Sequence, residues 1–447
     1  MQLESLDVSR NALSGDFPTI WSSHIEVLFA NDNFFSGNIP SSFGRMSELW
    51  LLNLANNHLT GVIPVSLGRL SNLQLLNLAN NYFTGMIPTS LSKCSSLKVI
   101  NLGNNSLVGN IPHEFSQLSE LYSLVVHTNT LNGAFPSLIA NCSKLQVLDI
   151  GNNLFGGEIP ISVTNISKLR VLVMKGNNFI DNILSEIGQL KSLQILRLSS
   201  NHISGSIPHT IVLFQAIAIE NQDGFILSTF DGYYRDGLAM VLKGTKQYFE
   251  YILSTLTSID FSNNELEGEV ASNFGNLKGL RLLNLSMNNL NGTIPNSLGE
   301  MSQLESLDLS RNHFSGKIPR ELEFLNFFGS LNLSNNNLSR IIPQGMHITS
   351  TFTESSFWGN PNLWGCPLPK NCTWRQYAPP PHPISMRKEK NNIEYPWYKI
   401  AMGLSYGVAF GGMLSLILTR ISWRRKYFNK VDTILKFFFP WMKNLTL

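Results

Sequence analysis

The chain has 447 residues, of which 43% are hydrophobic and only 14% are charged, well below the roughly 25% of charged residues in an average soluble domain. Its net charge of +3 is too small to indicate a nucleic-acid-binding protein. A globular chain of this length would form roughly two to four domains. An internal repeat overrides that estimate, because a solenoid grows by adding units that pack only on their neighbours.

A repeat of 24 residues runs through most of the chain. The stretch LWLLNLANNHLTGVIP at residues 49–64 returns as LQLLNLANNYFTGMIP at residues 73–88. Its asparagine recurs at intervals of 22, then 24 seven times, then 63, then 24 three times, at Asn11, Asn33, Asn57, Asn81, Asn105, Asn129, Asn153, Asn177, Asn201, Asn264, Asn288, Asn312 and Asn336. These intervals predict thirteen repeats with one insertion.

Each LxL segment predicts a short strand, with its leucines turned inward and the residues between them facing solvent on a concave sheet. The asparagine follows the strand, where its amide can bond to backbone groups that the strands leave unpaired. Glycine then permits a turn, and proline ends strand pairing because it lacks an N–H. Irregular turns are expected where other residues replace glycine or proline, at Asp181, Leu184, Ala271 and Arg340.

The pattern LxxLxxLxLxxNxLxGxIPxxLxxL resembles the plant extracellular class of leucine-rich repeat. This resemblance implies an α/β solenoid, a right-handed superhelix of short parallel strands. Repeats one to nine are assigned to residues 1–209 and repeats ten to thirteen to residues 255–346.

The insertion at residues 210–254 has aromatic residues and glycines but no LxL phase. It resembles the island domain of plant leucine-rich repeat receptor-like proteins, and the spacing from Tyr234 to Lys243 and Gly244 matches a motif of those islands. The resemblance implies a part in ligand or co-receptor recognition. The alternative is that its aromatic side chains cover a hydrophobic edge exposed where the stack is broken, and the two roles are compatible.

Four cysteines are too few for a disulfide-rich scaffold. Cys94 and Cys142 replace repeat leucines two repeats apart, which places them roughly 10 Å apart and beyond the about 7 Å limit for a disulfide. We expect both to be buried free thiols. Residues 347–377 resemble the C-terminal cap of these ectodomains, in which Cys366 and Cys372 could pair, although relatives usually have a cysteine where this chain has Trp364.

A spacer at residues 378–399 precedes a stretch at 400–419 without a charged residue, which is about long enough to cross about 30 Å of hydrocarbon. A buried core helix is the alternative. The tail at 420–447 has seven basic residues and one acidic residue, so the positive-inside rule places it in the cytoplasm. We therefore expect a single-pass plasma-membrane protein with an extracellular N-terminus.

Gly403, Gly407 and Gly411 are spaced by four residues within the predicted membrane helix. Such a doubled GxxxG stripe favours close pairing with a second helix. The resemblance implies that the partner is a leucine-rich repeat receptor kinase, bound through this helix and the C-terminal repeats, which supplies a catalytic domain that the short tail cannot hold.

Neither a phosphate loop, nor metal-ligand spacing, nor a catalytic motif is found in the sequence, so we expect no enzyme and no cofactor. At most concave positions the repeats carry Asn, Ser, Ala or Asp, but repeats six to nine depart from this pattern. The candidate ligand-binding residues there are Tyr122, His127, Arg170, Lys175 and Arg197. The three cations, on adjacent strands, would lie within reach of one carboxylate-bearing ligand, which could be a peptide, a protein or a glycan. A solvated face is the alternative for any one of them.

Sequons predict N-glycosylation at Asn104, Asn141, Asn165, Asn284, Asn291, Asn332, Asn337 and Asn371. The chain opens inside a repeat, without a secretory signal, so a truncated N-terminus is expected. The sequence thus favours a receptor-like protein that recognises an extracellular ligand and signals through a partner kinase in plant defence or development. The alternatives are an inhibitor of secreted cell-wall hydrolases and a non-signalling truncated decoy.

Overall fold

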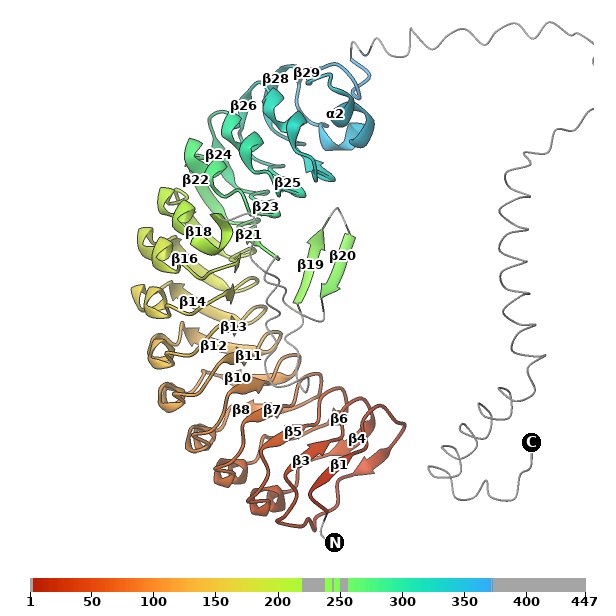
Figure 1. The fold of residues 1–447 in the computed structure, drawn as a ribbon, viewed down its shortest axis with the longest axis vertical. Coiled ribbons are helices and arrows are strands. Elements are labelled where there is room, and N and C mark those ends of the chain that lie inside the picture. The colour runs from red at the N-terminus through yellow and green to blue at the C-terminus, as the bar shows by residue number, and fades with distance from the viewer. Residues whose placement is uncertain (1–2, 219–237, 243–244, 250–255, 371, 373–447) are drawn as a thin grey trace, which may run out of the picture. The chain divides into compact units, whose positions relative to one another are not determined.

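The computed structural model describes residues 3–218, 238–242, 245–249, 256–370 and 372. The chain divides into two compact units, residues 1–378 and 379–447, and the described residues all belong to the first. In this unit the repeats stack side by side in a curved row, with one set of strands along its inner side (Figure 1).

The inner strands of the described residues form one thirteen-stranded parallel sheet. Neighbouring strands pair without a shift, as in Leu52 opposite Leu76, so each repeat presents equivalent positions in line. The strands are, in order, β1 (Ser5–Asp7), β3 (Val27–Phe29), β5 (Leu51–Asn53), β7 (Leu75–Asn77), β9 (Val99–Asn101), β11 (Ser123–Val125), β13 (Val147–Asp149), β15 (Val171–Val173), β17 (Ile195–Arg197), β21 (Ser258–Asp260), β23 (Leu282–Asn284), β25 (Ser306–Asp308) and β27 (Ser330–Asn332).

A second strand follows the repeat asparagine in most repeats, and these strands also pair in parallel. One sheet contains eight of the described strands, namely β8 (Thr84–Met86), β10 (Ser106–Gly109), β12 (Thr130–Ala134), β14 (Leu154–Glu158), β16 (Asn178–Asn182), β18 (His202–Gly205), β22 (Glu265–Glu269) and β24 (Asn289–Asn291). Shorter sheets flank it, formed by β2 (Ser14–Asp16), β4 (Phe34–Gly37) and β6 (His58–Leu59), and by β26 (Ser315–Gly316), β28 (Asn337–Ile341) and β29 (Asn362–Trp364).

The helical part of each repeat is a 3₁₀ helix, so the α component of the predicted α/β solenoid is small. In the described part of the chain α-helix occurs only at α1 (Gln215–Ala218) and α2 (Met346–Thr351). Short 3₁₀ segments suit the space, because each repeat leaves only a brief connection between its strands. They are η1 (Ser41–Arg45), η2 (Val65–Arg69), η3 (Thr89–Lys93), η4 (His113–Gln117), η5 (Ser137–Asn141), η6 (Ile161–Asn165), η7 (Ser185–Gln189), η8 (His209–Leu213), η9 (Ser272–Asn276), η10 (Asn296–Glu300), η11 (Arg320–Phe324) and, in the cap, η12 (Glu354–Ser356).

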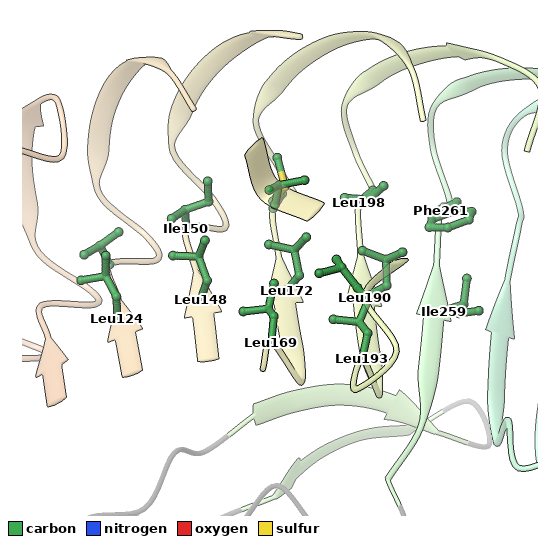
Figure 2. Close-up of a cluster of buried hydrophobic side chains, with 14 of the residues drawn as sticks. Leu124, Leu148, Ile150, Leu169, Leu172, Leu190, Leu193, Leu198, Ile259 and Phe261 are labelled. Carbon is green, nitrogen blue, oxygen red and sulfur yellow. The ribbon is translucent and has the colours of Figure 1, made fainter. Parts of the chain in front are cut away.

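The hydrophobic core is a continuous column between the two layers. Leu124, Leu148 and Leu172 occupy the same position in successive repeats, and all are fully buried (Figure 2). Cys94 and Cys142 lie in the same column and are free and buried, which confirms their expected state. Burial raises the pKa of each thiol to about 11.

The repeat asparagine ties each repeat to the one before it. Asn81 donates its amide N–H groups to the carbonyls of Leu54, Leu78 and Ala79 at 3.0–3.2 Å, and its Oδ1 accepts the N–H of Leu59 at 3.0 Å. Two of these partners belong to the preceding repeat. One buried side chain therefore satisfies the Leu59 N–H and adds a bond to three carbonyls, which also accept from Asn57 Nδ2, Asn105 Nδ2 and the Asn56 N–H.

The turns that depart from the repeat pattern are regular, contrary to the expectation. Arg340 and Asp181 have φ angles of 77° and 68°, like the glycines that they replace. Ala271 and Leu184 have φ angles of −65° and −60°, within the range that proline would impose. The neighbouring repeats hold these turns in register, so the local residue does not decide the geometry.

Replacing Arg340 with glycine is expected to stabilise the protein by roughly 1 kcal/mol, because a non-glycine residue in the left-handed region costs about that much. The midpoint of urea unfolding measures the change. Gly316 has a similar φ of 75°, so Gly316→Arg serves as the reverse control and should destabilise by a similar amount. A lower midpoint for Arg340→Gly would contradict this reading of the turn.

The sheet continues without a break across the insertion. β17 pairs directly with β21, with Ile195 opposite Ser258, so the inner sheet is not broken at the insertion, and the covering role of the insertion's aromatic side chains stays a prediction. The ninth repeat also extends past the predicted boundary at residue 209, since η8 ends at Leu213. Within the insertion the structure describes an antiparallel hairpin, β19 (Leu238–Leu242) and β20 (Thr245–Phe249).

The C-terminal cap covers the last repeat. Its strand β29 pairs with β28, and Ile348 and Phe357 are fully buried. Cys366 and Cys372 are joined by a disulfide, with their Cα atoms 4.6 Å apart. Among the described residues no helix is both long enough and apolar enough to cross a bilayer, and the predicted span at 400–419 lies outside them.

Candidate functional site

The variable positions of the inner sheet form ladders that run from repeat to repeat. On the edge where the chain enters each strand, Tyr122, Gln146, Arg170 and Gln194 follow one another, linked by backbone N–H···O bonds of 2.8–2.9 Å. Strand spacing of about 4.8 Å brings consecutive members of such a ladder into contact. This entry ladder is where the predicted residues Tyr122 and Arg170 lie.

Three cationic side chains line one hollow at this edge, and we call this hollow the basic hollow. It has a volume of about 420 Å³. Lys168 and Lys191 come from the turns before two neighbouring strands, and Arg170 comes from the entry ladder between them. The complete lining is Gln146, Lys168, Arg170, Lys191, Ser192, Gln194, Gln215 and Ala216. The lining contains no acidic residue, so the hollow is suited to an anionic group.

Arg170 is held in place by its neighbour on the ladder. Its Nε donates to Gln194 Oε1 at 3.1 Å. Burial of the guanidinium lowers the pKa of Arg170 from its ordinary value, and Tyr122 acts in the opposite direction. A guanidinium nevertheless stays protonated in proteins. Arg170 is therefore a preorganised and partly desolvated cation, the state in which charge recognition is strongest.

Arg197 already faces a carboxylate within the chain. It is 8% exposed, and its Nη2 lies 3.6 Å from Asp260 Oδ2. Asp260 also accepts hydrogen bonds from Ser199 Oγ at 3.1 Å and Ser262 Oγ at 2.7 Å. This buried network joins β17 to β21 across the insertion, so the structure places Arg197 in a contact between repeats.

Lys175 and His127 lie on the opposite edge, where the chain leaves the strands. A Cβ built on Gly151 would lie 3.3 Å from Lys175 Cγ, and one on Gly103 would lie 3.0 Å from the His127 ring. Each side chain thus rests over a glycine of the preceding repeat. Arg170 and Lys175 are five residues apart in an extended segment, roughly 16 Å, so a ligand would have to extend across the sheet to reach both.

The middle of the sheet in repeats six to nine is apolar. Val147, Val171 and Ile195 occupy equivalent positions on successive strands and are buried, and Tyr122 packs against their cluster. The basic hollow therefore lies beside a buried apolar cluster, in which Val171 and Ile195 are 1% and 0% exposed. Sequence reasoning missed Lys168 and Lys191 because they precede the strands, although basic residues at that place in neighbouring repeats are a usable signal.

Several other predicted positions differ in accessibility or lie outside the described residues. Asn104, Asn141, Asn165, Asn291 and Asn337 are exposed, whereas Asn284 and Asn332 are only partly exposed. Asn332 Nδ2 donates to Asp308 Oδ2 at 3.2 Å. Asn371, the island residues Tyr234, Lys243 and Gly244, and the helix residues Gly403, Gly407 and Gly411 lie outside the described residues.

No metal site is visible in the described part of the chain, where no three His, Cys, Asp or Glu side chains are grouped to hold an ion.

Models of the leucine-rich repeat family match the chain in both of its repeat blocks. One matches residues 71–124 and 254–314, and another matches 48–70, 144–166, 192–213 and 329–347. Both carry the description leucine rich repeat.

Similar proteins are found among plant receptors. Receptor-like protein 34 of Arabidopsis thaliana is 42% identical over 53 residues, which are 12% of this chain and 6% of that protein. The ectodomain of the Arabidopsis receptor kinase HAESA, solved with a peptide hormone ligand, is 32% identical with a TM-score of 0.65, covering 81% of this chain and 54% of that one.

The plant peptide hormone receptor RGFR1, solved in complex with RGF2, is 27% identical with a TM-score of 0.59, covering 80% of this chain and 59% of that one. The chain thus spans a little over half the length of these two ectodomains. With repeat models matching along it and plant receptor ectodomains sharing its fold, the chain is a leucine-rich repeat protein that is similar to plant leucine-rich repeat receptors and receptor-like proteins.

Proposed function

We propose that the chain is the ligand-recognition part of a cell-surface receptor-like protein that binds an extracellular peptide through the basic hollow. The observation that carries this proposal is the gathering of Lys168, Arg170 and Lys191 on one hollow without an acidic residue. Similar ectodomains were solved with peptide hormones. The proposal assigns no enzymatic activity to the chain.

A peptide fits the basic hollow by its chemistry. Its acidic group would pair with the cations, and its backbone could bond to the side-chain amides of Gln146 and Gln215 in the same lining. A few well-placed charged and polar groups that fix a ligand's orientation are usual in ligand sites. An inhibitor of hydrolases would use the same face, but no observation favours it over a peptide receptor.

We further propose that signalling passes to a partner receptor kinase beside the membrane, in defence or development. The support is the uncharged stretch at 400–419 and its stripe of Gly403, Gly407 and Gly411, read from the sequence. In this arrangement the repeats lie outside the cell, where the sequons would be used, and the basic tail lies on the inner leaflet.

The orientation is tested with epitope tags on intact plant protoplasts. A tag placed before Leu3 should be labelled by antibody without permeabilisation, and a tag placed after Leu447 only after it. The two tagged chains control each other, because both carry the same unaltered sequence. Labelling of the C-terminal tag on intact cells, or of neither tag, would contradict the proposed receptor.

A further inference from the structure

A second hollow, of about 530 Å³, lies in repeats one to five, on the edge where the chain leaves the inner strands. Two parallel rows of side chains line it, each advancing by one repeat at a time. One row is aromatic and the other is a row of primary amides, and together they are Phe34, His58, Tyr82, Asn56, Asn80 and Asn104. We call this site the aromatic–amide hollow, and it shares no residue with the basic hollow.

The aromatic row exposes apolar rings to solvent. Phe34 is 52% exposed and Tyr82 is 58% exposed. The His58 ring lies between them, with centroid distances of 5.7 Å to Phe34 and 5.9 Å to Tyr82. The same position in the next two repeats is Ser106 and Thr130. A row of exposed rings beside a hollow marks a binding surface, because solvent-exposed apolar area is stabilised only when a partner covers it.

The amide row is fixed by the backbone. Asn56, Asn80 and Asn104 all have φ angles of 54–55°, a conformation in which asparagine is favoured. Asn104 Nδ2 donates to Asn80 Oδ1 at 2.6 Å, and Asn56 Nδ2 donates to Asp32 Oδ1 at 2.6 Å. Each amide offers two N–H groups and two lone pairs, so these bonds leave both donors and acceptors for a ligand.

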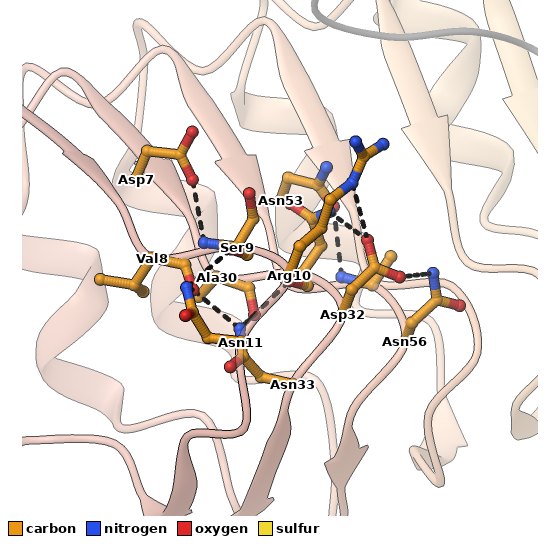
Figure 3. Close-up of polar contacts among 12 residues, drawn as sticks. Asp7, Val8, Ser9, Arg10, Asn11, Ala30, Asp32, Asn33, Asn53 and Asn56 are labelled. Atoms are coloured by element: carbon orange, nitrogen blue, oxygen red, sulfur yellow. Dashed lines mark hydrogen bonds and ion pairs between the residues drawn. The ribbon is translucent and has the colours of Figure 1, made fainter. Parts of the chain in front are cut away.

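The hollow has little net charge. Asp32 is its one acidic lining residue, and Arg10 Nε lies 4.0 Å from Asp32 Oδ2 (Figure 3). Figure 3 shows the Asp32 carboxylate between Arg10 and Asn56, with a contact to each. The row is therefore suited to an uncharged ligand with many hydroxyl groups, in contrast to the basic hollow.

The spacing of the rows favours a polymer other than a peptide. An extended peptide advances about 3.3 Å per residue, whereas neighbouring strands lie about 4.8 Å apart, so its polar groups would fall out of step with the amides. A sugar ring is a longer unit, with apolar C–H faces and polar hydroxyl edges. We propose that the aromatic–amide hollow binds an uncharged oligosaccharide, with sugar faces on Phe34 and Tyr82 and hydroxyls on the amide row.

Glycosylation of Asn104 would interfere with ligand binding in this hollow. Asn104 is also a sequon residue, with Ser106 at its third position, and a glycan attached there would occupy the hollow. Ser106→Ala removes the sequon and keeps the Asn104 amide. All binding measurements therefore use the full chain carrying Ser106→Ala.

The experiment is isothermal titration calorimetry of this purified chain with cellohexaose, mannohexaose and chitohexaose, and with an acidic oligogalacturonide. At least one uncharged oligosaccharide should bind, and Tyr82→Ala should weaken that binding about tenfold through loss of the ring contact, which corresponds to about 1.4 kcal/mol. Tyr82→Phe, which keeps the ring, should bind within about threefold of the parent, a difference of well under 1 kcal/mol. Phe324→Ala is the matched control, because Phe324 is 75% exposed on η11, and it should not change the affinity.

Three results would overturn the proposal. They are no heat of binding with any uncharged oligosaccharide, equal affinity for Tyr82→Ala and Phe324→Ala, or equal binding of the acidic oligogalacturonide. Tyr82 is exposed, so the melting temperature of Tyr82→Ala should match that of the parent and exclude unfolding as the cause. Because the site is separate from the basic hollow, failure here leaves the peptide-receptor proposal to its own tests.

Discussion

Asn81→Ala is expected to lower the free energy of unfolding by about 2 kcal/mol, because a buried backbone group left without a partner costs about 1–3 kcal/mol. Asn81 is 6% exposed and bonds to four backbone groups in two repeats. Alanine would leave the Leu59 N–H without its acceptor, whereas the three carbonyls would keep their bonds from Asn57 Nδ2, Asn105 Nδ2 and the Asn56 N–H. Since repeats are stabilised by their neighbours, the loss should also weaken the repeat that begins at Leu49.

Urea unfolding followed by far-ultraviolet circular dichroism measures this loss. Asn276→Ala is the control, because Asn276 is an exposed asparagine at the end of η9, and exposed substitutions usually change stability by less than about 0.5 kcal/mol. If Asn81→Ala and Asn276→Ala unfolded at the same urea concentration, the asparagine bonds would not be what couples the repeats.

Reversing the charge of Lys168 and Lys191 together is expected to weaken binding of an acidic peptide at least about a hundredfold, or about 2.7 kcal/mol. Both residues line the basic hollow beside Arg170, and two glutamates would repel a ligand carboxylate there. The probe is a peptide selected by the full chain from a random-sequence library. Calorimetry with the Lys168→Glu, Lys191→Glu variant gives the change in Kd.

The control for that variant is Lys93→Glu, because Lys93 is an exposed lysine at the end of η3. It makes one such lysine-to-glutamate change, half the charge change of the double variant, away from the basic hollow. Its affinity should match that of the parent, and the parent affinity should fall as salt is added, since part of the binding is electrostatic. Equal losses in the double variant and in Lys93→Glu would show a non-specific charge effect.

The fold could be predicted because each repeat carries a local sequence pattern. Leucine spacing indicates the strand and the repeat asparagine marks its end, so the 24-residue period is enough to locate the strands. The turns at Asp181 and Arg340 could not be predicted as regular, because neighbouring repeats impose that geometry. The 3₁₀ character was also missed, since a five-residue helical segment has no periodicity from which to read its type.

The site was predicted only in part because ligand contacts depend on which edge of the sheet a side chain occupies. Arg170 and Lys175 are close in sequence but lie on opposite edges. Arg197 looked available, but its carboxylate neighbour Asp260 is 63 residues away along the chain and adjacent in the sheet. That pairing is visible only once β17 is known to pair with β21 across the insertion.

The central claim, that the inner sheet of repeats seven to nine is a peptide-binding surface, is tested most directly by mapping a bound peptide. A selected peptide carrying a photoreactive group is cross-linked to the full chain, and the labelled residues are identified by mass spectrometry. We predict labels on the entry ladder and the basic hollow, between Gln146 and Ala216. Labels confined to the 3₁₀ helices on the outer side, such as η6 and η7, would contradict the account.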